Sequence, residues 1–372
     1  ARRAGQVDMI RAIRSPGSTL KPLIYGFGFD DLLIHPETLI DDAPTRFGGY
    51  SPGNFHHTYA GQLTVREALQ QSLNIPAVAV LEQVGPARVA ARLREVGLPL
   101  HWNAAHPQPG LPLVLGGVGM SLEELVTLYV GLANGGEIAP LRFGPADPDE
   151  PGRTVLTGAA CWYLADILRS APPPQNVLTP SSLAWPRTIA YKTGTSYGFR
   201  DAWALGFDPD YTVGVWVGRP DGSPSPGYYG RNTAAPLLFR IFDLLPAPAT
   251  PPTAPPAGVW QVSRDQLPER LRYFHTHPVL DITGAPPLSI TFPMTGSMVE
   301  LPSQNGELAE LPLTAKGGVK PLRWLVNGRP LAGSSWRRDA FWSPDGEGLA
   351  RITVLDQSGQ SASAEVWIGR SQ

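Results

Sequence analysis

A proline-rich run limits what this chain of 372 residues can fold into. Six of the eleven residues from Pro246 to Pro256 are proline, so the run cannot donate a regular ladder of hydrogen bonds and favours an extended conformation. A chain of this length can hold two or three domains. We therefore expect a linker at 246–258 that mechanically decouples a first domain at 1–245 from a second at 259–372.

The first domain mixes the hydrophobic periods of helices and strands. The turn-forming sequence Asp208-Pro209-Asp210 joins two of the expected strands. Expected helices cover 64–71, 86–96, 121–133 and 233–245, and expected strands cover 187–195, 202–207 and 211–217. This mixture indicates an α/β or α+β domain.

The second domain shows only short runs with strand-like alternation. The clearest runs are 288–292, 322–326, 350–355 and 362–368. Asn327-Gly328 follows the second of them and is a strong hairpin signal, because both residues tolerate positive φ. We expect six or seven strands in a small all-β sandwich of immunoglobulin-like type. Its tryptophans, Trp324, Trp336, Trp342 and Trp367, are expected mainly in the core, although a glycan or partner surface is the alternative.

Composition excludes several classes of function. A net charge of -2, with arginines scattered along the chain, gives no support for nucleic-acid binding. The single cysteine, Cys161, excludes an internal disulfide and lies in a pattern typical of a buried helix face. His56-His57 has no partner cluster with metal-ligand spacing, so we expect neither a metal nor a cofactor.

Lysine is rare in this chain, and its positions are informative. Of the 30 basic residues only four are lysine, and Lys21 and Lys192 are the only two before residue 246. A desolvated lysine can lose its proton near neutral pH, whereas arginine cannot. Codon bias explains the scarcity of lysine but not these two positions, which both lie in short motifs typical of acyl transfer.

The first motif is Ser18-Thr19-Leu20-Lys21. A serine hydroxyl needs a nearby base to become a nucleophile, and residues i and i+3 of a helix share one face. Pro22 is tolerated only in the first turn, so the helix must begin close to Ser18. This pattern predicts Ser18 as nucleophile and Lys21 as base.

The second motif is Ser72-Leu73-Asn74, at the end of an expected helix. Ser72 offers a hydroxyl that can relay a proton, and Asn74 offers an amide that can orient Lys21 or a substrate. Alternatively, Asn74-Ile75-Pro76 is a plain helix stop.

The third motif, Lys192-Thr193-Gly194-Thr195, ends an expected strand. Its lysine and hydroxyls can hold a carboxylate, and Gly194 lets a ligand approach the backbone. A cation at Lys192 would also lower the pKa of Lys21 by repulsion between like charges. In this order the three motifs resemble those of β-lactamases and penicillin-binding proteins.

Longer segments around the motifs make the resemblance specific. The segments 14–25, 59–78 and 192–207 resemble the three active-site segments of class A penicillin-binding proteins. Leu115-Gly116-Gly117-Val118-Gly119 and the β-rich second domain favour the branch of penicillin-binding protein 1C. The implied fold is the serine β-lactamase and penicillin-binding protein transpeptidase fold, an α+β fold with an antiparallel sheet and a helical subdomain.

The resemblance implies a role for each motif residue in a D,D-transpeptidase. Ser18 forms the acyl-enzyme with a D-Ala-D-Ala stem peptide, and the backbone N–H groups of Ser18 and Thr195 form the oxyanion hole. Lys21 is the base and Ser72 the proton relay. Asn74, Lys192, Thr193, Gly194 and Thr195 bind the substrate.

The resemblance also implies a longer protein. The family carries two strands of the same sheet before its active serine, preceded by a glycosyltransferase domain and a membrane anchor. We therefore expect this chain to be a C-terminal part of a protein anchored at the periplasmic face of a bacterial inner membrane. Peptidoglycan stem peptides and β-lactams are the expected ligands, with an envelope protein or glycan as a further partner.

Two other functions fit the same motifs. A D,D-carboxypeptidase or a β-lactamase uses water in place of the acceptor amine, and acylation is common to all of these enzymes. A non-catalytic module would sense β-lactams or act as a scaffold, but the intact Ser18, Lys21, Ser72 and Lys192 weigh against that alternative.

Overall fold

The computed structural model describes most of the chain, and the described residues form two compact units. Residues 7–47, 50–55, 58–102, 109–148, 150–174, 187–275, 288–304, 307–331, 336–357 and 360–371 are described. The first unit takes its described residues from Ala1–Glu37, Leu69–Ser72 and Ala77–Leu271, and the second takes them from Thr38–Ala68, Leu73–Pro76 and Arg272–Gln372. The units therefore do not follow the order of the chain. The division into 1–245, 246–258 and 259–372 stays a prediction.

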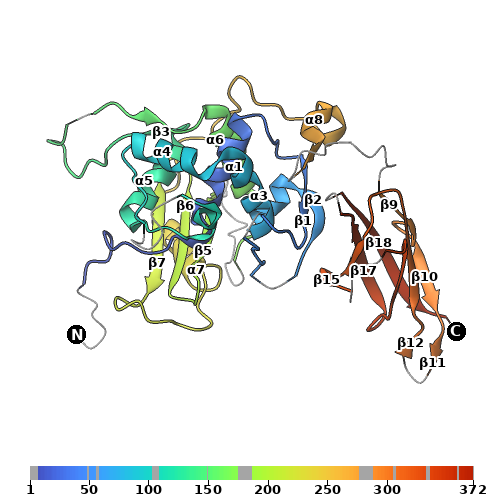
Figure 1. Cartoon of the computed structure of the whole chain (residues 1–372). Coiled ribbons are helices and arrows are strands. Elements are labelled where there is room, and N and C mark those ends of the chain that lie inside the picture. Colours follow the sequence, from blue (N-terminus) through green and yellow to red (C-terminus); the bar gives the residue numbers. More distant parts are fainter. Residues whose placement is uncertain are drawn as a thin grey trace. The chain divides into compact units, whose positions relative to one another are not determined.

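The centre of the first unit is a three-stranded antiparallel sheet (Figure 1). Its strands are β5 (Ala190–Thr195), β6 (Asp201–Phe207) and β7 (Thr212–Gly218), in the order β5-β6-β7. The carboxylate of Asp208 accepts hydrogen bonds from the backbone N–H groups of Asp210 and Tyr211 and closes the turn between β6 and β7. The three predicted strands are confirmed.

Helix α7 (Ala234–Leu244) buries its apolar face against this sheet. Leu238 and Phe242 from the helix join Tyr191, Ala204 and Val215 from the strands in one core cluster. The closing helix predicted at 233–245 is confirmed, and the amphipathic pattern explains it because only one face is apolar.

The other predicted helices also form, and residues typical of helix starts precede or begin two of them, α5 (Leu122–Ala133) and α4 (Pro86–Glu95). Ser121 makes a reciprocal capping box with Glu124 at the start of one helix, and Pro86 lies in the first turn of another. The helical segments are η1 (Gly17–Leu20), α1 (Lys21–Asp30), α2 (Val65–Gln70), α3 (Asn74–Val84), α4 (Pro86–Glu95), η2 (Leu111–Leu115), α5 (Leu122–Ala133), α6 (Gly158–Arg169), η3 (Arg264–Gln266) and α8 (Glu269–Arg272). Strands β3 (Glu137–Ile138) and β4 (Arg153–Thr154) form a short hairpin. Cys161 is buried in α6, and burial raises the pKa of its thiol to about 12.

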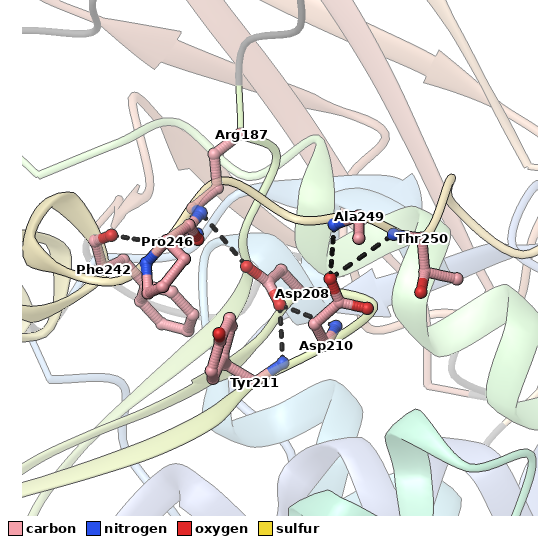
Figure 2. A network of polar contacts seen from close by, with 8 residues as sticks. All are labelled: Arg187, Asp208, Asp210, Tyr211, Phe242, Pro246, Ala249 and Thr250. Carbon is pink, nitrogen blue, oxygen red and sulfur yellow. Dashed lines mark hydrogen bonds and ion pairs between the residues drawn. The ribbon is translucent and has the colours of Figure 1, made fainter.

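The proline-rich run carries no helix or strand, but it is bonded to the first unit (Figure 2). Arg187 pairs with the buried carboxylate of Asp208 at 3.1 Å and donates to the backbone carbonyl of Pro246. The carboxylate of Asp210 accepts a hydrogen bond from the N–H of Ala249 at 2.6 Å. The start of the run is therefore fixed beside the turn between β6 and β7.

Further along, two aromatic residues of α6 hold the same segment. Trp162 donates its indole N–H to the carbonyl of Thr253 at 3.0 Å. The hydroxyl of Tyr163 accepts from the N–H of Trp260 at 2.6 Å, and the carbonyl of Trp260 lies 2.9 Å from the ring of His35. Residues 246–260 are thus not a free tether, contrary to the expectation from composition.

The second unit begins with a small sheet built from distant parts of the chain. Strand β1 (Leu39–Asp42) pairs antiparallel with β2 (Gly61–Thr64) and parallel with β8 (Tyr273–Phe274). This pairing joins residues near position 40 to the C-terminal part of the chain, and no local sequence pattern predicts it.

The rest of the second unit is all-β. A five-stranded sheet has the order β10-β18-β17-β14-β15, and a three-stranded sheet has the order β16-β13-β9. Leu313 from the smaller sheet shares a core cluster with Trp324 and Ile352 from the larger one, as in a two-layer sandwich. The strands are β9 (Ser289–Phe292), β10 (Met298–Leu301), β11 (Ser303–Gln304), β12 (Glu307–Leu308), β13 (Leu311–Lys316), β14 (Arg323–Val326), β15 (Arg329–Pro330), β16 (Asp339–Trp342), β17 (Gly348–Leu355) and β18 (Ser361–Arg370).

Three details of this region differ from the sequence expectation. Ten strands form among the described residues from 289 to 370, more than the six or seven expected, and β10 and β18 pair in parallel. The hairpin at Asn327-Gly328 is confirmed, with φ values of 50° and 75°. The expected burial of the tryptophans holds for Trp324, which is buried, but not for Trp336 and Trp367, which are 69% and 50% exposed.

Candidate active site

The chain around Ser18 enters its helix through a tight turn. The 3₁₀ turn η1 contains Ser18 and leads directly into α1, which begins at Lys21 with Pro22 in its first turn. The backbone N–H of Lys21 donates to the carbonyl of Ser18. Side chains at i and i+3 of a 3₁₀ turn lie on the same side, so Ser18 and Lys21 share one face. The predicted helix start is confirmed.

Two glycines let this turn lie directly against the end of β5. A Cβ on Gly17 would be 2.5 Å from the carbonyl oxygen of Thr195, and a Cβ on Gly194 would be 2.5 Å from the carbonyl oxygen of Pro16. Gly17 also has a φ of +53°, which other residues rarely adopt. We expected Gly194 to let a ligand approach the backbone. The structure shows that it also lets the turn before Ser18 lie against β5.

The three motifs meet at Ser72. The amine of Lys21 donates to the backbone carbonyl of Ser72 at 2.6 Å, and the amine of Lys192 donates to its hydroxyl at 2.7 Å. Both lysines are buried, with 0% and 4% of their surface exposed. Buried lysines need hydrogen-bond partners, so Ser72 is held by two motifs that lie far from it in the sequence.

Ser72 has an unusual backbone. Its φ is +58°, in the left-handed region, which costs a residue with a side chain about 1–2 kcal/mol. Such strained residues persist only where the surrounding structure fixes them, and they cluster at functional sites. The N–H groups of Ser72 and Leu73 donate to the carbonyls of Leu69 and Ala68 at 3.1 and 3.0 Å, so this left-handed residue also ends α2 as a C-terminal cap does.

The charge of Lys192 differs from the sequence expectation. Burial, with a smaller contribution from the nearby Arg231 guanidinium, lowers the pKa of Lys192 to about 7. We expected a cation at this position, and the lowered pKa weakens its positive charge near neutral pH. Besides Ser72, the amine donates to the backbone carbonyl of Thr193 at 2.8 Å.

Thr195 is braced by a later loop. Its hydroxyl oxygen accepts a hydrogen bond from the N–H of Gly230 at 3.0 Å, so the hydroxyl proton is not used in this bond. A Cβ on Gly230 would be 2.6 Å from the carbonyl oxygen of Gly194, so only glycine fits there. The sequence reasoning missed Gly230 and Arg231, because neither lies in a motif.

Asn74 belongs to the second unit. Its backbone N–H donates to the side-chain oxygen of Asn54 at 2.9 Å, and its own amide donates to the carbonyl of Gly53 at 2.6 Å. Asn54 in turn donates to the buried carboxylate of Asp42. Sequence reasoning missed Asn54 and Asp42, and no local pattern marks them.

Among the described residues, no group of three or more His, Cys, Asp or Glu side chains could hold a metal ion, and His56-His57 lies outside these residues. Among the same residues, no helix has the length and apolar character needed to cross a membrane.

Two family models match the chain. The penicillin-binding protein transpeptidase domain matches residues 4–243, and the penicillin-binding protein C-terminus family matches residues 280–368. The first range contains all three motifs and covers more than half of the chain.

Curated relatives agree with the first match. Penicillin-binding protein 1C of Escherichia coli is 46% identical over 244 residues, which is 65% of this chain and 31% of that protein. Penicillin-binding protein 1F of Bacillus subtilis is 31% identical over 233 residues, 57% of this chain and 31% of that protein. The chain thus spans about a third of the length of these relatives.

Solved structures support the fold. Penicillin-binding protein 1A from Haemophilus influenzae has a TM-score of 0.54 at 20% identity, covering 68% of this chain and 46% of that chain. The penicillin-binding protein PonA1 from Mycobacterium tuberculosis has a TM-score of 0.56 at 20% identity, covering 69% of this chain and 78% of that chain. From the motifs, the matched domain and the shared fold we conclude that the chain belongs to the penicillin-binding protein transpeptidase family.

Proposed function

We propose that this chain is a serine D,D-transpeptidase, which cross-links peptidoglycan stem peptides ending in D-Ala-D-Ala and is acylated by β-lactams. The observation that carries the proposal is the meeting of the three motifs at Ser72. Lys21 and Lys192 both bond to this serine, and the turn that contains Ser18 packs against Thr195.

In the first step, Ser18 attacks the carbonyl carbon of the penultimate D-alanine. Lys21, on the same face of the turn, takes the hydroxyl proton, while the N–H groups of Ser18 and Thr195 stabilise the oxyanion. The bond from this carbonyl carbon to the nitrogen of the terminal D-alanine then breaks. Ser72 relays the proton to that nitrogen, and an ester on Ser18 remains.

In the second step, the amine of another stem peptide attacks the ester. A new amide forms, the bond to Ser18 breaks, and the proton lost by the amine returns to the serine oxygen. Asn74 positions the substrate, and Gly194 lets its backbone lie along β5. Lys192, Thr193 and Thr195 bind the terminal carboxylate, a role to which an amine with a pKa of about 7 contributes most while it is protonated.

The acceptor distinguishes this function from its alternatives. The chain should be incubated with a D-Ala-D-Ala pentapeptide and a labelled D-amino acid as acceptor amine. We expect release of D-alanine with incorporation of the label, and neither in Ser18→Ala. Release without incorporation would identify a carboxypeptidase, rapid hydrolysis of penicillin a β-lactamase, and activity that survives in Ser18→Ala would contradict the proposal.

We also propose the setting of the whole protein. The resemblance to class A penicillin-binding proteins supports a glycosyltransferase domain and a membrane anchor elsewhere in the protein, and a location at the periplasmic face of the inner membrane. Residues 1–245 would be the transpeptidase domain, 246–258 a connection and 259–372 a C-terminal domain, which is compatible with the matched ranges 4–243 and 280–368. Fractionation of cells that express the full-length protein, with lipid II polymerisation as the assay, tests both points.

The C-terminal region supplies a surface for an envelope partner, protein or glycan. Met298, Trp367 and Leu349 are exposed and lie side by side on β10, β18 and β17. An apolar row with an aromatic ring suits either kind of partner. Retention of an envelope protein or of purified glycan strands by the wild-type chain, with loss in Trp367→Ala, is the expected result.

A further inference from the structure

The second motif is anchored by a buried amide in the second unit. Asn54 is 5% exposed, and its amide nitrogen donates to both carboxylate oxygens of Asp42, at 2.8 and 2.9 Å. The same nitrogen donates to the carbonyl of Thr58 at 2.9 Å, while its side-chain oxygen accepts from the N–H of Asn74. Every polar atom of the Asn54 side chain is thus used, and the side chain is fixed in one orientation.

Asp42 is fixed as well. It is fully buried at the end of β1, and its carboxylate also accepts from the N–H of Ala60 at 2.7 Å. A buried carboxylate with several hydrogen bonds is held in one position, because each lost bond would leave a charge unsolvated. The orientation of Asn54 is therefore set by β1.

The C-terminal region bonds to two residues beside the pair Asp42 and Asn54, namely Asp41 and Ala60. The hydroxyl of Ser361 in β18 donates to the carboxylate of Asp41, the neighbour of Asp42 in β1. The guanidinium of Arg351 in β17 donates to the carbonyl of Ala60 at 2.9 Å, next to the N–H that binds Asp42. β8 extends the same small sheet by pairing with β1.

Gly61 allows β2 to lie directly against strands β17 and β18. A Cβ on Gly61, which has a φ of +72°, would be 2.6 Å from the hydroxyl oxygen of Thr353 in β17 and 3.1 Å from that of Ser363 in β18. The first residue of β2 thus lies directly on the sheet formed by residues 348–370.

We propose that the C-terminal β region positions the second motif of the active site, through β1 and the buried pair Asp42 and Asn54. Ser361 bonds to Asp41 of β1, and Arg351 bonds to Ala60, whose N–H binds Asp42. Asp42 accepts from Asn54, and Asn54 accepts from the N–H of Asn74. Asn74 starts α3 two residues after the strained Ser72, so its anchor limits the conformations open to this turn. Asp42 and Asn54 are positioning residues, and their effect on acylation rests on the proposed function.

Hydrogen exchange of the peptide around residues 69–76 tests the anchor without using activity. In the wild-type chain the Asn74 amide should exchange slowly, since it is bonded to a buried side chain. Asn54→Ala removes the acceptor and should remove the protection. Asn54→Asp keeps the shape and the acceptor but sets a second carboxylate against Asp42, and it should reduce the protection.

A matched pair of serine variants tests the contribution of the C-terminal region. Ser361→Ala removes the bond to Asp41, whereas Ser343→Ala removes only a weak surface contact with Glu310 in the same region. Ser361→Ala should speed exchange of the Asn74 amide, and Ser343→Ala should leave it unchanged. These two substitutions decide the matter even if Asn54→Ala does not fold.

Acylation kinetics supply the functional measurement. A displacement of about 1 Å at a catalytic group can cost about 100-fold in rate. We expect Asn54→Ala to lower the acylation rate constant by about this factor, and Ser361→Ala by about 3-fold, with the initial non-covalent binding of penicillin unchanged. A merely structural defect would instead lower the active fraction and leave the rate constant of the remainder unchanged.

The outcomes separate this inference from the proposed function. Failure of the wild-type chain to react with penicillin would contradict the proposed function and leave the hydrogen exchange results standing. A normal Asn74 amide and a normal acylation rate constant in folded Asn54→Ala or Asn54→Asp would overturn the inference. So would equal behaviour of Ser361→Ala and Ser343→Ala.

Discussion

The buried amine of Lys192 should make the stability of the chain depend on pH. Its pKa is about 7 in the folded chain against an ordinary value of 10.5, so the folded state binds fewer protons than the unfolded state between these values. Unfolding becomes less favourable as pH rises wherever the unfolded state binds more protons. The cost of burying Lys192 is therefore complete below pH 7, shrinks from pH 7 to 10.5, and is gone above.

The size of the effect follows from the same two values. A fall of about 3.5 pH units corresponds to about 5 kcal/mol at 1.36 kcal/mol per unit. Between pH 7 and pH 9 the linkage relation gives a gain of about 2 kcal/mol in the free energy of unfolding. Lys192→Met keeps the length of the side chain and removes the titration, so it should lack this gain and be more stable than the wild type at pH 7.

Denaturant unfolding at pH 7, 8 and 9 measures the difference between the two proteins, so the titrations that they share cancel. We expect the stability advantage of Lys192→Met to shrink by about 2 kcal/mol over this range. A constant difference would show that Lys192 keeps an ordinary pKa near 10.5 although it is buried. A stability advantage of Lys192→Met that grows with pH would show that folding raises the pKa of Lys192 instead of lowering it.

Three other changes test the site. Lys21→Arg keeps the charge but cannot act as a base, so penicillin acylation should slow by about 1000-fold or more in stopped-flow measurements; near-normal rates would exclude Lys21 as the base. Gly17→Ala should cost about 3 kcal/mol of stability by thermal unfolding, through its positive φ and the overlap with Thr195, whereas Gly85→Ala, which has a positive φ but open space, should cost less; equal losses would contradict the close approach. Gly230→Ala should slow acylation by displacing the bond to Thr195, with initial β-lactam binding as the internal comparison, and an unchanged rate would show that the loop does not brace β5.

The parts of the site that depend on local periodicity could be predicted from the sequence. Ser18 and Lys21 share a face because they are three residues apart, and Pro22 fixes the start of the helix. The strands from 190 to 218 and the hairpin at Asn327-Gly328 follow in the same way from alternation and turn residues.

Contacts between distant residues could not be predicted, because no local pattern records them. The bond between Lys192 and Ser72, the approach of Gly17 to Thr195 and the anchor of Asn74 on Asn54 all depend on the tertiary arrangement. Composition also misled in one respect. A proline-rich run has no hydrogen bonds of its own, but its carbonyl groups and few N–H groups can still bond to a neighbouring surface.

The mass of the intact chain after incubation with penicillin shows whether Ser18 is the acylated nucleophile. One covalent equivalent of penicillin is expected, on a peptide that contains Ser18, because this serine alone of the motif serines shares a turn with a lysine at i+3. The adduct should be absent in Ser18→Ala and present in a folded Ser196→Ala control, which removes the serine directly after Thr195 in the third motif. An adduct on Ser72 or Ser196, or no adduct with the folded wild-type chain, would exclude Ser18 as the nucleophile.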